Sequence, residues 1–220
     1  ASLESLKDTE SLMEKYPFVY GAFGIHPDDA DKMTEETLEE IRKLCKLSKA
    51  VAVGEIGLDY YWHKEEHEHE IQKKMFRAQM EIAREAQMPF MIHSREAAKD
   101  TLDIVKDCMK GGMYGGIIHC FSYAKEMARE YLDMGLYLGI GGVVTFKNAK
   151  KLKEVVEYAP LSQIVLETDS PYLSPEPNRG KRNDSRNLIF VAREIAQIKG
   201  ITEEEVIAVT EENAEKLLLR

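Results

Sequence analysis

Histidine and carboxylate residues recur in this chain near the ends of short apolar segments. His26 lies in GIHP, Glu55 in GEIGLDY, His93 in MIHSRE, His119 in IIHCFS and Asp169 in VLETDSP. Imidazole and carboxylate groups that converge can hold a divalent metal ion and leave open positions for water and substrate. The ion would lower the pKa of a bound water, and a carboxylate such as Asp169 could accept the proton. We therefore predict that Glu55, His93, His119 and Asp169 bind one or two ions.

Each of these residues also has a purely structural interpretation. His26 precedes a proline and can cap a turn, and a lone His93 or His119 is more often a satisfied buried histidine. Asp169 can cap the next turn, and Glu55 can pair with an arginine. The metal interpretation is favoured because the residues follow five separate apolar segments, which makes a coincidence of five structural roles a poor explanation.

Basic residues form a second group with possible chemistry. Arg95 lies two residues after His93, and the others follow the last two apolar segments: Lys147, Arg179, Lys181 and Arg182. Arginine offers a planar pair of donors that fits a phosphate group. The alternative is a solvated basic loop. We interpret these residues as contacts to phosphate, which favours a phosphate ester as the substrate.

Aromatic residues cluster after the segment that holds Glu55 and again after His119. Aromatic side chains on such loops can stack on nucleobases, and equally often they pack loops against each other. Both interpretations stay open for the five residues, which are Tyr60, Tyr61, Trp62, Phe121 and Tyr123.

The segment between His63 and His69 is rich in histidine and glutamate. No glutamate follows His63 directly, so the order HExxH of zinc proteases is absent. We interpret the segment as the solvated start of a helix.

The residues with possible chemistry need a scaffold that brings distant segments together. Six apolar segments, each followed by a stretch with helical periodicity, predict buried strands over residues 18–25, 50–58, 89–92, 115–118, 136–140 and 163–166. This alternation is typical of a parallel α/β sheet, either doubly wound or closed into a barrel. A doubly wound sheet usually has an early glycine-rich turn, whereas the candidate at 139–142 comes late. We therefore predict a TIM barrel, in which the strand ends meet at one rim.

Composition excludes several classes of protein. The chain has 220 residues, 44% of them hydrophobic, a formal net charge of −9 and three cysteines. These values exclude a disordered chain, a disulfide framework and a broad basic face that coats nucleic acid. No apolar run is long enough for a membrane helix, and the first residues do not resemble a signal peptide. We predict one cytoplasmic domain over residues 1–220 and a monomer.

Six motifs together resemble the TatD family of metal-dependent deoxyribonucleases. They are GIHP (24–27), GEIGLDY (54–60), IHSRE (92–96), HCFS (119–122), ETDSPYLSP (167–175) and RGKRN (179–183). The resemblance implies an amidohydrolase-type TIM barrel that uses Mg²⁺, Mn²⁺ or Zn²⁺ to hydrolyse phosphodiester bonds of DNA, with single strands or 3′ ends as candidate substrates. It implies that Glu55, His93, His119 and Asp169 are metal ligands and that Asp169 is also the base. His26 matches a histidine at the rim whose role is not assigned.

One feature of the family is missing. The family opens with a His-x-His pair on its first strand, and no such pair precedes His26. Six predicted strands are also fewer than the eight of a closed barrel. We expect that a first strand, a helix and a second strand precede Ala1 in a longer gene product. The alternative is a real fragment, in which only the site made by Glu55, His93 and His119 keeps its ligands.

Two other functions remain open at this stage. Related barrels hydrolyse amides, esters or lactones with the same kind of metal site, because a fold does not fix a reaction. A protein that lacks one metal position could also be a non-catalytic binding protein. The basic loop distinguishes a phosphodiesterase from an amidase, and bound metal distinguishes the enzymes from a binding protein.

Overall fold

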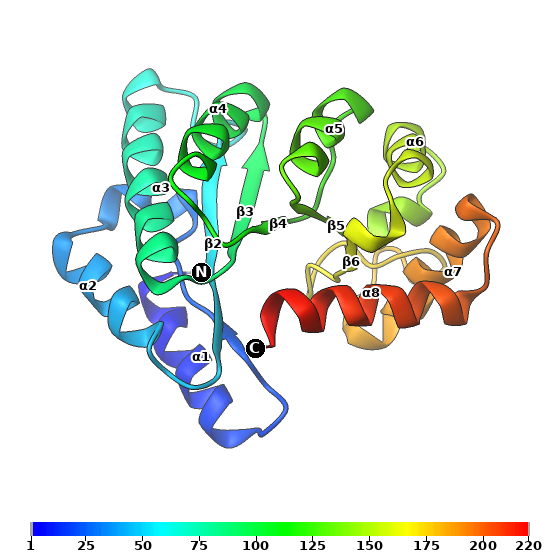
Figure 1. The fold of residues 1–220 in the computed structure, drawn as a ribbon, viewed down its shortest axis with the longest axis horizontal. Helices are drawn as coiled ribbons and strands as arrows, with labels where there is room; N and C mark the ends of the chain where they lie inside the picture. Colours follow the sequence, from blue (N-terminus) through cyan, green and yellow to red (C-terminus); the bar gives the residue numbers. More distant parts are fainter. Residues whose placement is uncertain (1, 220) are drawn as a thin grey trace. The chain divides into compact units, whose positions relative to one another are not determined.

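Strands and helices alternate along most of the chain, as the sequence predicts (Figure 1). A computed structural model describes residues 2–219. By their internal contacts these residues divide into a first unit, residues 1–117, and a second unit, residues 118–220. The single domain over residues 1–220 stays a prediction.

The first unit holds three parallel strands in the order β1–β2–β3. α3 packs against β2, and it also contacts α2 and α4. The elements are α1 (Leu3–Lys15), β1 (Gly21–Ala22), the 3-10 helix η1 (Pro27–Lys32), α2 (Glu35–Leu44), β2 (Ala50–Asp59), α3 (Glu66–Ala86), β3 (Phe90–Arg95) and α4 (Ala98–Met109). The short strand β4 (Gly116–Ile118) lies at the boundary of the two units.

The second unit has its own parallel strand pair, β5 with β6. α5 packs against β5 and α6, while α8 packs against β6 and α7. The elements are α5 (Lys125–Asp133), β5 (Tyr137–Ile140), η2 (Gly142–Thr145), α6 (Lys150–Tyr158), η3 (Leu161–Gln163), β6 (Ile164–Leu166), η4 (Ser185–Asn187), α7 (Leu188–Lys199) and α8 (Glu203–Leu218).

All six predicted strands are present, but two differ from the predicted length by more than one residue. β1 covers two residues rather than 18–25, and Phe18 and Tyr20 at the start of that segment are exposed. The aromatic start of the segment therefore does not enter the core. β3 extends to Arg95, so His93 lies within the strand and not after it. The backbone of Tyr60 reaches this extension, since its N–H donates to the Arg95 carbonyl over 2.9 Å.

Each unit has an apolar core between its strands and helices. Fully buried side chains of the first unit include Phe23, Ile25, Ile56, Leu58, Phe76, Met80, Phe90 and Ile92. Those of the second unit include Tyr131, Leu138, Ile140, Val155, Val156, Ile164 and Ile195. Strands covered by apolar side chains on both faces are what continuous apolar segments predict for parallel sheets.

Two buried glutamines of α3 hold backbone of the first unit, one at Ile25 after β1 and one at Asp59, the last residue of β2. The Gln79 side chain accepts from the Ile25 N–H over 2.7 Å and donates to the Ile25 carbonyl over 3.1 Å. Gln72 does the same for the backbone of Asp59, over 2.9 and 3.2 Å. Each amide thus satisfies a buried donor and a buried acceptor that would otherwise cost free energy. They fix the backbone immediately before His26 and at the end of β2.

The three cysteines, Cys45, Cys108 and Cys120, form no disulfide. Burial raises the pKa of the Cys45 thiol to about 11, which makes it unreactive. No helix within residues 2–219 is both long and apolar enough to cross a bilayer.

Candidate metal centre

Three potential metal ligands of the first unit come together. The Nδ1 atom of His93 on β3 lies 3.2 Å from Oε1 of Glu55 on β2. The ring centroids of His26 and His93 are 4.3 Å apart. One ligand atom from each of the three residues lies within 4.8 Å of the others. Two imidazoles and one carboxylate at this spacing are a ligand set that suits a divalent ion.

Asp59 at the end of β2 holds His93 from its other side. Its Oδ2 atom lies 2.9 Å from Nε2 of His93, and its Oδ1 atom accepts from the N–H groups of Tyr61 and Trp62 over 2.9 and 3.0 Å. The side chain is almost completely buried. Burial opposes ionisation of Asp59, but the hydrogen bonds from His93 and the Trp62 N–H outweigh it and lower its pKa. Asp59 is therefore a charged, fully engaged carboxylate.

The two carboxylates around His93 decide which ring nitrogen can face an ion. Burial disfavours protonation of His93, yet hydrogen bonds to Asp59 and Glu55 raise its pKa to about 9. A hydrogen bond from Nε2–H to the buried Asp59 leaves Nδ1 on the side of Glu55. Histidine ligands commonly donate their second nitrogen to a carboxylate in this way. The residues therefore fit an ion held by Nδ1 of His93 and an oxygen of Glu55.

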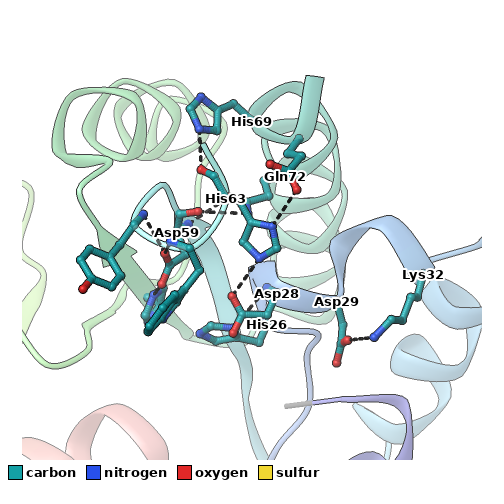
Figure 2. Close-up of polar contacts among 12 residues, drawn as sticks. His26, Asp28, Asp29, Lys32, Asp59, His63, His69 and Gln72 are labelled. Atoms are coloured by element: carbon teal, nitrogen blue, oxygen red, sulfur yellow. Dashed lines mark hydrogen bonds and ion pairs between the residues drawn. The ribbon is translucent and has the colours of Figure 1, made fainter. Parts of the chain in front are cut away.

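His26 caps a turn, one of the roles considered for it, and it also lies next to the candidate ligands Glu55 and His93. It caps η1, because its Nδ1 accepts from the Asp28 N–H over 3.3 Å. Figure 2 shows the Asp28 carboxylate between His26 and His63, with Oδ2 at 3.3 Å from His26 Nδ1 and Oδ1 at 3.2 Å from His63 Nε2. Burial and then the neighbouring His93 lower the pKa of His26. A neutral imidazole is the form that binds metal.

His63 differs from the prediction of a solvated helix start. α3 begins at Glu66, so His63 precedes the helix, and its side chain is only 24% exposed. The ring bridges Asp28 of η1 to Glu68 of α3, whose Oε1 lies 3.1 Å from Nδ1. The sequence gives no periodic signal for this contact, because η1 and α3 are far apart along the chain.

The second unit carries its own histidine between two carboxylates. His119 lies just after β4, with Nε2 at 3.2 Å from Oδ1 of Asp169 and Nδ1 at 2.5 Å from Oε2 of Glu167. The other Glu167 oxygen, Oε1, is buried and has no hydrogen-bond partner within the described residues. A buried oxygen without a partner is rare, and its explanations include a catalytic role and a bound ion or water. Glu167 stands in the ETDSP motif but was not among the predicted site residues.

Glycines make room for the Glu167 side chain. A Cβ atom at Gly139 would lie 2.5 Å from Oε2 of Glu167, and one at Gly141 would lie 3.3 Å from Oε1. The glycine-rich segment 139–142 therefore cradles a carboxylate instead of a phosphate. Asp169 has a φ of 56° and Cys120, next to His119, a φ of 45°. Non-glycine residues in this region are strained, and such strain is concentrated at functional sites.

The five basic residues predicted to contact phosphate lie on exposed positions. The Arg95 guanidinium lies 4.0 Å from the centroid of the Tyr61 ring. Arg179 has structural contacts, since its guanidinium lies 4.2 Å from the Phe146 ring centroid and 4.0 Å from a Glu176 oxygen. The others are the exposed Lys147, Lys181 and Arg182.

The loop that follows Asp169 is closed by a buried asparagine. Asn183 donates from its side chain to the carbonyls of Thr168 and Tyr172 over 2.6 and 2.8 Å. Its own N–H donates to the Pro171 carbonyl over 3.0 Å. The last residue of RGKRN thus stabilises the turn beside Asp169, and Lys181 and Arg182 just before it remain exposed.

Every predicted metal ligand has another one close by. The structure pairs Glu55 with His93 in the first unit and His119 with Asp169 in the second, each over 3.2 Å. It also places His26 next to the first pair. Asp59 and Glu167 contact the second ring nitrogen of His93 and of His119, respectively. The only signal for these two carboxylates in the sequence is their position inside GEIGLDY and ETDSP.

Comparison with known proteins supplies the family. The TatD related DNase family matches residues 1–219. The chain belongs to the TatD family. A Bacillus subtilis relative, named uncharacterized metal-dependent hydrolase YabD, is 47% identical over 207 residues, which cover 94% of this chain and 80% of that protein. A Citrobacter rodentium relative, named 3'-5' ssDNA/RNA exonuclease TatD, is 33% identical over 222 residues, which cover 98% of this chain and 83% of that protein.

A solved TatD structure supports the fold. The crystal structure of YJJV, a TatD homolog from Escherichia coli K12, superposes with a TM-score of 0.89 at 26% identity, over 98% of this chain and 82% of that chain. The predicted α/β fold of the TIM-barrel type is therefore confirmed, and this TatD-family chain is a metal-dependent hydrolase. The His-x-His strand before Ala1 stays a prediction.

Proposed function

We propose that this TatD-family hydrolase is a deoxyribonuclease that cleaves phosphodiester bonds, with single-stranded DNA as its substrate. One observation carries the proposal: each of the two histidines, His93 and His119, lies between two carboxylates within 3.2 Å. The exposed basic residues and the name of the Citrobacter rodentium relative support a nucleic-acid substrate. Its cytoplasmic location and monomeric state remain predictions.

The proposed ligands are Glu55 and His93 Nδ1 in the first unit, and His119 Nε2 and Asp169 in the second. They would hold one or two ions of Mg²⁺, Mn²⁺ or Zn²⁺, with His26 as a neighbouring imidazole. When bound, such an ion polarises a phosphoryl oxygen and makes water a stronger acid. Two features fit this proposal: Oε1 of Glu167 has no hydrogen-bond partner among residues 2–219, and His26, Glu55 and His93 have the spacing of metal ligands.

The chain's own residues would orient the substrate and move the proton. Asp169 lies at a strained turn that aims its carboxylate at His119, so it is our candidate to accept a proton from the attacking water. Asp59 and Glu167 would keep the two imidazoles in one orientation. Arg95 and the exposed residues Lys147, Arg179, Lys181 and Arg182 would bind backbone phosphates.

The test is hydrolysis of an end-labelled single-stranded oligonucleotide by the purified chain, with Mg²⁺, Mn²⁺ or Zn²⁺. Asp169→Asn and Glu55→Ala should lower the rate by about 100-fold or more, which is the usual effect of losing a general base. The same variants should bind Mn²⁺ more weakly by calorimetry. Asp133→Asn removes an exposed carboxylate at the end of α5 and should leave both readouts unchanged.

Three outcomes would contradict the proposal. Equal rates for Asp169→Asn and the parent chain would exclude Asp169 as the base. Hydrolysis of an amide, ester or lactone that is insensitive to Arg182→Gln and Lys181→Gln would favour the other enzyme class. Absence of Mn²⁺ binding together with absence of cleavage would favour a non-catalytic binding protein.

A further inference from the structure

Two exposed aromatic rings and one guanidinium lie together beside the candidate site of the first unit. We call Tyr61, Trp62 and Arg95 the Trp62 platform. The Tyr61 and Trp62 rings are nearly perpendicular, with centroids 4.6 Å apart. The Arg95 guanidinium lies 4.0 Å from the Tyr61 centroid and 5.5 Å from that of Trp62. Trp62 is 65% exposed, so the indole is presented to solvent and not to the core.

The turn that carries the platform is fixed at three points. The Tyr60 N–H donates to the Arg95 carbonyl over 2.9 Å, and the N–H groups of Tyr61 and Trp62 both donate to Oδ1 of Asp59. The other oxygen of Asp59 holds His93. One buried carboxylate therefore fixes both the platform and a proposed metal ligand.

The two outer rings differ in their contacts from Tyr60. Tyr60 is the aromatic residue of this turn that packs inward, since it stacks on His69 at 3.6 Å between ring centroids and donates to Asp100 over 2.8 Å. Tyr61 and Trp62 instead contact each other and Arg95. The sequence left open whether these aromatics pack loops or bind bases, and the structure separates Tyr60 from the other two.

We propose that the Trp62 platform is the subsite for an unpaired base of single-stranded DNA, with a flanking phosphate on Arg95. The proposal rests on the proposed function and adds to it the residues that select the substrate. A flat apolar ring next to a planar cation matches the two parts of a nucleotide, its base and its phosphate. A chain with a net charge of −9 repels polyanions in general, so a fixed local cation is needed to hold one.

The subsite predicts a preference for single strands. In a duplex both faces of a base are covered by its neighbours, and the platform would have to unstack it at a cost in free energy. An unpaired base offers its face without that cost. A strand held on Trp62 would be positioned through Asp59 and His93, so base binding and cleavage are expected to respond together to changes in this turn.

The test uses the fact that Trp62 is the single tryptophan of the chain. Its fluorescence is recorded while the Mn²⁺-loaded protein is titrated with a short thymidine oligonucleotide whose phosphorothioate linkages slow hydrolysis. We expect quenching by this strand, and much weaker quenching by an abasic strand of equal length and charge or by a duplex. Equal quenching by the abasic strand would overturn the base subsite.

Variants separate stacking from charge. By anisotropy of a labelled strand, Trp62→Ala should weaken binding about 10-fold, whereas Trp62→Phe should retain most of the affinity. Arg95→Lys keeps the charge but loses the planar cation, and should weaken binding less than Trp62→Ala. Phe18→Ala removes an exposed aromatic ring outside the platform and should leave the affinity for the strand unchanged.

The outcomes distinguish this proposal from the proposed function. Unchanged affinity and cleavage in Trp62→Ala would overturn the platform and leave the nuclease assignment intact. Quenching without any metal-dependent cleavage would support the platform and contradict the nuclease. If the parent chain binds no oligonucleotide, both proposals fail.

Discussion

The two proposed ligand histidines are held through opposite ring nitrogens. His93 is held through Nε2 by Asp59, and His119 through Nδ1 by Glu167. Each bond fixes which nitrogen carries the proton and leaves the other facing Glu55 or Asp169. With Zn²⁺ bound, the two imidazoles are therefore expected to carry their single proton on opposite nitrogens, which two-dimensional NMR of nitrogen-labelled histidine can distinguish.

Protonation of His63 should make stability depend on pH. Burial disfavours its charged form, but hydrogen bonds to Glu68 and Asp28 outweigh burial and raise its pKa above the ordinary 6.5. The stabilisation is then fully present below pH 6.5 and is lost as pH rises through the raised pKa. We expect His63→Gln to cost about 1 kcal/mol of unfolding free energy near pH 6 and less near pH 8.5, measured by urea denaturation.

His67→Gln is the matched control for this measurement, because His67 is exposed and lies four residues further along the chain. Its effect on the free energy of unfolding should be small at both pH values. An equal cost of His63→Gln at the two pH values would mean that the charged form of His63 contributes nothing.

At the scale of the strand, β2 has no room for a side chain where Gly57 faces His93 of β3. Gly57 has a φ of 144°, and a Cβ atom there would lie 1.9 Å from the His93 carbonyl oxygen. The two residues are paired in the parallel register of β2 and β3. The second glycine of GEIGLDY is thus needed because the backbone of His93, a proposed ligand, lies against it. A side chain at position 57 would displace that backbone.

Gly57→Ala should destabilise the chain and displace His93. Strain at the positive φ alone costs about 1–3 kcal/mol, and the clash with the His93 carbonyl adds to it. Gly112→Ala is the matched control, since Gly112 also has a positive φ, 81°, but has nothing within 4 Å of the added carbon. Urea denaturation should show a larger loss for Gly57→Ala. Equal losses of unfolding free energy in the two variants would mean that the clash adds no cost, because β2 and β3 can move apart at this point.

At the scale of the whole chain, the sequence predicts the order of the elements and the residues that pair as candidate ligands. Continuous apolar segments locate the strands, because strands of a parallel sheet are buried on both faces. Glu55, His93, His119 and Asp169 are recognisable because ligand-type residues near such segments are uncommon. The pairing of Glu55 with His93 and of His119 with Asp169 agrees with that reasoning.

Contacts that depend on three-dimensional geometry were not predictable from the sequence. Asp59, Glu167 and Asn183 look like ordinary polar residues in the sequence. Only the folded chain shows that Asp59 and Asn183 are each held by several partners and that Glu167 lies against His119. Exposure at Phe18 is a second example, because an aromatic residue next to a strand is not distinguishable from a strand residue by its type.

The overall charge of the chain predicts a weak dependence of DNA binding on salt. At most five candidate cations would contact phosphates and so displace counterions from the DNA strand. They are Arg95, Lys147, Arg179, Lys181 and Arg182. With about 0.7 counterions per phosphate for single strands, the slope of log affinity against log salt should be no steeper than about −3.5. Anisotropy titrations over a range of KCl concentrations measure it. A steeper slope would show that other basic residues contact the strand.

The paired glutamines of α3 make the length of that helix critical. Gln72 and Gln79 are seven residues apart, and each clasps the backbone of one residue, Asp59 or Ile25. Inserting or deleting one residue between them would rotate one amide about 100° around the helix axis and shift it by about 1.5 Å. This stretch should therefore accept many substitutions on its outer face and no insertion or deletion.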